Sequence, residues 1–317
     1  MNITSLLTFC FALLLPHQCF SNTSARDVCK IEGKNDRLRC GNIVSHYLPS
    51  EMFERFDEDV HGFTNNMKYL EISQSNISVL QARSFKYARS LSQVILSNIS
   101  LQEIEQSAFE GLSVLKWVDL SYNLLKKIPP DTFKVTGVKH LKLDGNTQLE
   151  IPTNGPLFNT SKLVWLSMRK CNIQHLPGSA FKPNVGLSHL DLAQNKLSML
   201  PEQLFVTLNH LVYLDLSDNR FQTLDIKLFR NVPSFPDFPR TVMLAGNPWE
   251  CDCRLASTIK WMLQNLDDKT WARNPRMSRL RRPVLCQTPN ALAGVYWNSL
   301  QELVETCRIQ NTINKSF

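Results

Sequence analysis

One spacing of large apolar residues repeats along most of this chain. The clearest copy places its apolar residues and one asparagine at Leu211, Leu214, Leu216, Asn219, Phe221 and Leu224. This spacing follows neither the 3.6-residue period of an amphipathic helix nor the alternation of a half-buried strand. It predicts a short strand with Leu214 and Leu216 pointing inward, followed by a turn. The side-chain amide of Asn219 can satisfy backbone groups that a buried turn leaves unpaired.

The same frame recurs seven times, and an eighth copy is partial. Position one of the seven copies falls at Met67, Leu91, Leu115, Val138, Leu163, Leu187 and Leu211, with spacings of 24, 24, 23, 25, 24 and 24 residues. Each unit also has a phenylalanine at nearly the same place, and these residues predict a stacked aromatic spine inside the convex side. They are Phe85, Phe109, Phe133, Phe158, Phe181, Phe205 and Phe229. A unit of this size cannot bury its apolar face alone, so the sequence predicts a solenoid of stacked repeats.

The frame is interrupted in four units. In the fourth unit Leu149 falls one place late, and the segment 152–156 is expected to loop out from the convex side. Ser75 and Ile99 stand where the first and second units should have asparagine, so those two turns are expected to be less well braced. Cys171 takes the asparagine position of the fifth unit, and we interpret it as a buried free thiol.

The start of the chain and its cysteines indicate an extracellular protein. Leu6–Leu15 is an apolar run of signal-peptide length, and cleavage is expected after Ser21, with Ala25 as the alternative. Nine cysteines among 317 residues favour an oxidising compartment, whereas the net charge of +7 says little about partners. Five glycosylation sequons remain after cleavage, at Asn22, Asn76, Asn98, Asn159 and Asn314. No other run is long enough to span a membrane.

The cysteines outside the repeats mark two terminal caps. Cys29 and Cys40 are interpreted as one disulfide that clips a hairpin over the first repeat. Four more follow the repeats, at Cys251, Cys253, Cys286 and Cys307, and are better read as two disulfides than as a zinc site. Their spacing leaves three possible pairings. Residues 257–266 read as a helix that covers the end of the solenoid.

The chain resembles extracellular leucine-rich repeat proteins with cysteine-capped ends, such as Slit, chaoptin and Toll-type receptor ectodomains. The segment 247–255, followed by Trp261 and the last two cysteines, carries the resemblance most closely. The resemblance implies the pairings Cys251–Cys286 and Cys253–Cys307, and an α/β solenoid: a leucine-rich repeat horseshoe with a concave parallel sheet. The amino-terminal cap departs from the family, because it has two cysteines instead of four. The expected organisation is signal peptide 1–21, cap 22–66, repeats 67–247, cap 248–307 and polar tail 308–317.

Binding is the function that the sequence favours. The chain has none of the nucleotide-binding, metalloprotease or hydrolase motifs of enzymes, and nothing indicates a cofactor or a metal. We expect a secreted protein that binds an extracellular protein or glycan, in host defence, adhesion or development. The alternative is the truncated or soluble ectodomain of a Toll-type or other leucine-rich repeat receptor. Nucleic acid is a poor partner for a secreted chain without a base-stacking module.

The candidate binding surface is the concave face. Position three of each unit flanks the inward-pointing position four, so it should face the open side of the sheet. Five adjacent units carry a ring there, and this ring row is Trp117, His140, Trp165, His189 and Tyr213. Position five adds Asp119, Asp191 and Asp215, which should favour a ligand with basic groups. A simpler interpretation is that the rings only stack along the sheet.

Two further features bear on ligands. A basic patch in the second cap comprises Lys269, Arg273, Arg276, Arg279, Arg281 and Arg282. It is either a solvated loop or a site for sulfated glycans or acidic membrane surfaces. A glycan at Asn98 should shade the concave face near the second repeat, whereas one at Asn159 should project from a convex loop. Ligand contacts should then concentrate in repeats three to seven.

Overall fold

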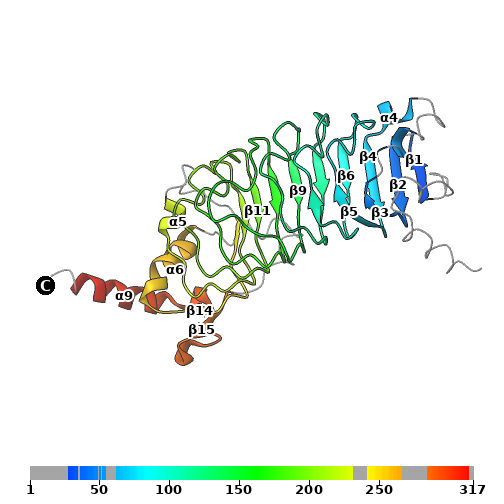
Figure 1. Cartoon of the computed structure of the whole chain (residues 1–317). Coiled ribbons are helices and arrows are strands. Elements are labelled where there is room, and N and C mark those ends of the chain that lie inside the picture. Colours follow the sequence, from blue (N-terminus) through cyan, green and yellow to red (C-terminus); the bar gives the residue numbers. More distant parts are fainter. Residues whose placement is uncertain are drawn as a thin grey trace, which may run out of the picture.

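The repeats form a single row of stacked units. The computed structural model describes residues 28–34, 36–48, 50, 52–54, 62–230, 241–265 and 284–313. The strands lie side by side along one face of the solenoid, and the carboxyl-terminal helices lie at its far end (Figure 1). The expected leucine-rich repeat solenoid with a parallel sheet is thereby confirmed. None of the helices in these ranges is long and apolar enough to cross a membrane.

The main sheet has ten strands within the described ranges. Their order is β1 (Cys29–Glu32), β2 (Arg37–Gly41), β4 (Tyr69–Ser73), β6 (Gln93–Ile95), β8 (Trp117–Asp119), β9 (His140–Lys142), β10 (Trp165–Ser167), β11 (His189–Asp191), β12 (Tyr213–Asp215) and β13 (Thr241–Met243). All neighbours are parallel except the β1–β2 hairpin. Each central strand buries position four completely, as Leu141, Leu166 and Leu190 show.

A small second sheet braces the flank of the first repeats. It contains β3 (Val44–Tyr47), β5 (Asn76–Leu80) and β7 (Glu103–Ile104), all parallel. Among the described residues of the solenoid are two one-turn helices, α4 (Phe63–Asn66) before the first unit and α5 (Lys227–Arg230) near the end of the seventh.

Buried asparagines at position nine tie neighbouring units together. The Asn123 amide donates to the carbonyls of Leu96 and Leu120, while its oxygen accepts from the backbone N–H groups of Ile99 and Leu101. Asn146, Asn195, Asn219 and Asn247 bridge their neighbours in the same way. The residue at position eight, directly before the asparagine position, has a positive, left-handed φ in every unit from Gln74 to Gly246. This conformation turns the chain out of the strand.

The three substitutions at position nine have different consequences. The Ser75 hydroxyl accepts from the backbone N–H of Ile43 and donates to the Ser73 carbonyl, so it replaces part of the asparagine pattern. The Ile99 side chain is buried and offers no polar atom. The Cys171 thiol is buried, free of a disulfide and directed at the Leu143 carbonyl at 3.1 Å, and burial raises its pKa to about 12.

The phenylalanine spine predicted from the sequence is in ring contact from Phe85 to Phe158 and again between Phe205 and Phe229. All seven rings are buried, and neighbouring ring centroids lie 5.4 Å apart between Phe85 and Phe109 and 5.3 Å apart between Phe109 and Phe133. Both caps extend the row. The Phe53 ring packs on Phe85 at 6.2 Å, and the Trp261 ring stacks on Phe229 at 5.2 Å.

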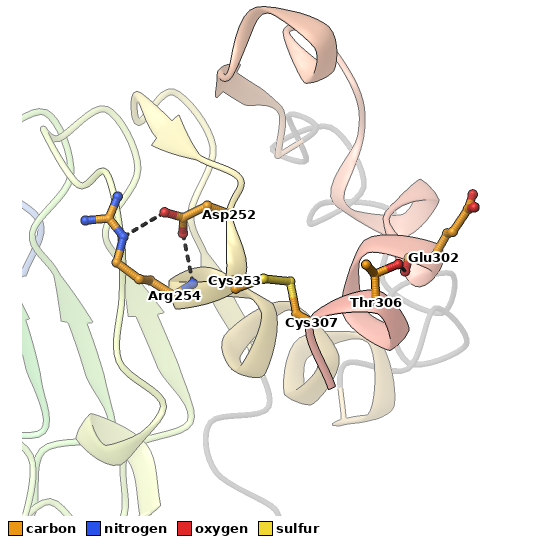
Figure 2. Close-up of a disulfide and its surroundings, with 6 residues drawn as sticks. All are labelled: Asp252, Cys253, Arg254, Glu302, Thr306 and Cys307. Atoms are coloured by element: carbon orange, nitrogen blue, oxygen red, sulfur yellow. Dashed lines mark hydrogen bonds and ion pairs between the residues drawn. A yellow bond between two sulfur atoms is a disulfide. The ribbon is translucent and has the colours of Figure 1, made fainter. Parts of the chain in front are cut away.

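In the described part of the carboxyl-terminal cap, two helices and two disulfides close the solenoid. The elements of this cap are β14 (Trp249–Glu250), α6 (Cys253–Asn265), β15 (Cys286–Thr288), the 3₁₀ turns η1 (Asn290–Leu292) and η2 (Trp297–Ser299), and α9 (Gln301–Ile313). Cys251 bonds to Cys286, and Cys253 bonds to Cys307, which are the pairings that the resemblance implies. Figure 2 shows the second disulfide joining the start of α6 to α9, beside the Asp252–Arg254 ion pair. The ion pair has an N–O distance of 2.7 Å.

The structure extends the expected elements at three places. β2 continues the parallel sheet into the amino-terminal cap, with Leu38 and Cys40 buried like the leucines of a repeat and Cys40 bonded to Cys29. The helix α6 begins at Cys253 rather than at residue 257. The helix α9 continues past Cys307 to Ile313 and so includes part of the segment 308–317, which the sequence predicts to be a polar tail.

Candidate binding surface on the concave face

The ring row lies across five adjacent parallel strands. The register pairs Trp117 with His140, His140 with Trp165, Trp165 with His189 and His189 with Tyr213. Each of these side chains is half-buried, whereas the next residue along each strand is fully buried in the core. The parallel pairing therefore holds five rings at one height on the concave face.

The rings stack in two groups. The Trp117 ring lies 5.0 Å from His140 and 6.1 Å from Trp165, and both pairs are nearly parallel. The His189 and Tyr213 rings stack at 5.8 Å. The rings do stack on one another along the sheet, and this stacking fixes their orientation. Part of each ring nevertheless remains exposed to solvent. A fixed ring loses little conformational freedom when a ligand packs on it.

The row of exposed rings does not continue into the first two repeats. Gln93 interrupts it, and the Tyr69 ring lies under the guanidinium groups of Arg37 and Arg39, at 5.4 and 5.9 Å. The Tyr69 hydroxyl also donates to Glu71. This end of the concave face therefore carries cations over its ring, and the uncovered rings begin at Trp117.

Two cations lie among the carboxylates: Lys142, which belongs to the position-five column, and Arg169, which sequence reasoning missed. The Arg169 guanidinium pairs with Asp191 at 3.0 Å and with Asp215 at 3.5 Å. Lys142 Nζ lies 3.7 Å from Asp119 and 4.0 Å from Asp144. Arg169 and Asp144 occupy position seven, whose side chains share the concave face with positions three and five, so the alternation could have identified them. The acidic column is thus partly neutralised within the protein.

Burial perturbs the titration of this surface. Burial, followed by the nearby Asp215 carboxylate, raises the pKa of Asp191 to about 6, although Arg169 and the Ala193 N–H oppose the shift. Burial raises the pKa of Tyr213 above its ordinary range, and the neighbouring carboxylates add to this shift. Burial lowers the pKa of both His140 and His189, so both imidazoles are neutral at pH 7.

We expect the free energy of unfolding of the Asp191→Asn variant to rise relative to that of the native protein as the pH increases from about 4 to about 7. The folded state holds the Asp191 proton up to about pH 6, whereas the unfolded chain releases it at lower pH. The contribution of Asp191 to the free energy of unfolding therefore falls across this window, and asparagine has no such loss. Denaturant unfolding of both proteins through the window measures the difference. A difference independent of pH would contradict the expectation.

A shallow hollow lies at the carboxyl-terminal end of the ring row. It has a volume of about 250 Å³, and its lining includes Arg169, Tyr213, Asp215, Asp218 and Met243. The Asp215 carboxylate accepts from the Ser217 N–H at 2.9 Å and from the Tyr213 hydroxyl at 3.3 Å. The hollow therefore offers a ligand both a ring and a carboxylate network of fixed geometry.

The structure describes three of the five predicted glycosylation sites. Asn76 and Asn98 are exposed, whereas Asn159 is half-buried and its amide donates to Asp131 at 2.7 Å. Asn22, Asn314 and the whole basic patch lie outside the described residues. Within the described ranges, no group of three histidine, cysteine or carboxylate side chains is placed to hold a metal ion.

The described residues form a solenoid of stacked repeats with a disulfide-bonded cap at each end, and comparison with known proteins agrees. The leucine rich repeat family model matches residues 89–147 and 161–221. Rabbit lumican is 31% identical over 191 residues, which cover 60% of this chain and 92% of lumican. Human oligodendrocyte-myelin glycoprotein is 26% identical over 79% of this chain and 50% of its own length. Human trophoblast glycoprotein (5T4) has the same fold, with a TM-score of 0.66 at 20% identity over 86% of this chain and 95% of that structure.

The chain belongs to the leucine-rich repeat family, and within it to the extracellular proteins with cysteine-capped ends. Relatives of this kind are named as glycoproteins and receptors, which are binding proteins and not enzymes. The chain spans about half the length of oligodendrocyte-myelin glycoprotein.

Proposed function

We propose that this protein is secreted and binds an extracellular protein or glycan through the ring row of its concave face. The observation that carries the proposal is the alignment of five half-exposed rings on β8 to β12, each fixed by a neighbouring ring. Exposed tryptophan and tyrosine side chains are enriched at binding hot spots. Host defence, adhesion and development remain the candidate processes.

The charges beside the rings support a mixed polar ligand. Arg169 and Lys142 offset part of the negative charge of Asp119, Asp144, Asp191 and Asp215, so four carboxylates face two cations. Basic groups of a ligand would meet the excess carboxylates. Asn98, exposed near the second repeat, would carry a glycan that confines ligand contacts to repeats three to seven. We retain sulfated glycans as proposed partners of the basic patch 269–282.

A second candidate is the ectodomain of a longer cell-surface receptor. The chain spans half of oligodendrocyte-myelin glycoprotein and 23% of a Toll-like receptor 3, so these two relatives carry the repeats within longer proteins. The genomic sequence after the codon for Phe317 separates the candidates. An in-frame apolar run of about 20 residues would favour the receptor.

We expect Trp117→Ala and Trp165→Ala each to weaken ligand binding by more than ~1 kcal/mol, because both remove fixed apolar surface from the centre of the row. The ligand is first isolated by affinity capture with the tagged protein from extracellular fluid, and affinities are then measured by calorimetry. Tyr296→Ala is the matched control, since this exposed ring lies in the carboxyl-terminal cap. A double tryptophan variant with native affinity would place the binding site elsewhere.

A further inference from the structure

An apolar hollow opens at the fourth repeat. It has a volume of about 460 Å³, within the range of ~300–1,000 Å³ typical of small-molecule sites. Most of its lining is aliphatic, aromatic or proline: Ile128, Pro129, Pro130, Leu149, Ile151, Pro152, Leu157, Phe158 and Met168. None of these residues belongs to the ring row.

The hollow has a cause in the repeat frame. Position eleven of the other six full units is a large apolar residue that is buried: Ile77, Leu101, Leu125, Ile173, Leu197 and Phe221. The fourth unit has Gln148 there, and its side chain is exposed. Leu149, one place later, is only half-buried, so no side chain fully replaces the missing one. The neighbouring Ile128 and Ile151 also remain half-buried.

The hollow reaches from the surface into the solenoid. Its deep lining consists of Leu157, Phe158 and Met168, all of which are buried. Met168 directly follows β10, so the hollow extends to the strand layer behind the concave face. Its surface lining includes three prolines, whose fixed φ angles hold the walls in place. An elongated apolar molecule would therefore bind without ordering a flexible wall.

A charged pair lies at the opening. Lys127 Nζ and a Glu150 carboxylate oxygen are 3.1 Å apart, and both side chains are more than half exposed. An exposed pair of this kind contributes little stability, so an incoming anion can compete for the lysine at small cost. Lys127 is the only cationic residue that lines the described hollow.

We propose that the fourth-repeat hollow binds an aliphatic carboxylate, with the hydrocarbon chain among Leu149, Ile151 and Phe158 and the carboxylate at Lys127. This site is separate from the concave ring row. The buried apolar lining supplies the binding free energy, because it removes the hydrocarbon from water. The lysine at the opening sets the orientation of the ligand.

The proposal is tested with dodecanoate titrated into the full chain by calorimetry at neutral pH. Saturable binding is expected, and Ile151→Trp should reduce the affinity at least tenfold by filling the hollow. Leu200→Trp is the control, because Leu200 is the half-buried residue at the same position of the sixth unit and does not line the hollow. Native affinity in Ile151→Trp, or no binding to the native protein, would overturn the proposal. If Ile151→Trp does not fold, Leu149→Phe replaces it.

The carboxylate is tested by changing the charges at the opening. Lys127→Gln should weaken dodecanoate binding about threefold, whereas Glu150→Gln should strengthen it by removing the competing anion. Dodecanol, which lacks the charge, should bind more weakly than dodecanoate to the native protein and equally to both variants. Equal affinity for the alcohol and the acid would overturn the assignment of an anionic ligand.

Discussion

Phe133→Ala is expected to lower the free energy of unfolding by about 3–5 kcal/mol. The Phe133 ring is buried at the middle of the phenylalanine spine, with ring centroids 5.3 Å from Phe109 and 5.9 Å from Phe158. Truncation would leave a cavity between two repeats whose backbones are tied by the asparagine ladder, so the site cannot collapse to fill it. Urea unfolding followed by circular dichroism gives the difference.

Val135→Ala provides the control for this measurement. Val135 follows in the same convex loop, but its side chain is 64% exposed. Its truncation should change the free energy of unfolding by less than about 0.5 kcal/mol. A loss of under 1 kcal/mol in Phe133→Ala would show that the spine is not a main source of stability.

Removal of the Cys253–Cys307 disulfide is expected to cost ~2–5 kcal/mol. The double variant Cys253→Ser, Cys307→Ser unlinks the start of α6 from α9 and frees the unfolded chain over 54 residues (Figure 2). Because Trp261 of α6 covers the last ring of the spine, loosening the helix would also expose Phe229. Limited proteolysis should therefore cut the variant first within the cap, and thermal unfolding should start at a lower temperature.

Cys171→Ala separates loss of the disulfide from loss of a buried sulfur. Cys171 forms no disulfide, so its variant should keep the protease resistance of the cap. A cap that resists proteolysis equally in the double serine variant and in Cys171→Ala would show that packing alone holds α6 in place.

The repeat frame was predictable because each unit must bury the same kinds of side chain at the same positions. Two inward leucines, one buried asparagine and one phenylalanine recur at nearly constant spacing in most units. A unit that departs from this pattern can therefore still be aligned by the units on either side of it. The caps lack this redundancy. Leu38 and Cys40 in β2 carry only two of the frame positions, and Phe53 is a single ring in a segment without periodicity. Nothing local distinguished them from an ordinary hairpin and loop.

The concave face was predictable for its rings but not for its charge balance. Position three could be followed through every unit, and the parallel register places those rings in a row. Arg169 forms ion pairs with carboxylates on β11 and β12, one and two strands away. The reach of a long arginine side chain across strands depends on its rotamer, which a sequence pattern does not encode. The fourth-repeat hollow had a visible origin in the late Leu149, but its depth depends on packing.

The continuation of the phenylalanine spine into both caps bears on how the molecule comes apart. In a linear stack the end units have one neighbour and fray before the middle. Here Phe53 and Trp261 give the outermost spine rings a second aromatic neighbour. The terminal repeats are thus energetically similar to internal ones, and amide exchange should be slow along the whole array instead of rising toward its ends. We therefore expect the array to unfold as one cooperative unit, and not repeat by repeat from its ends.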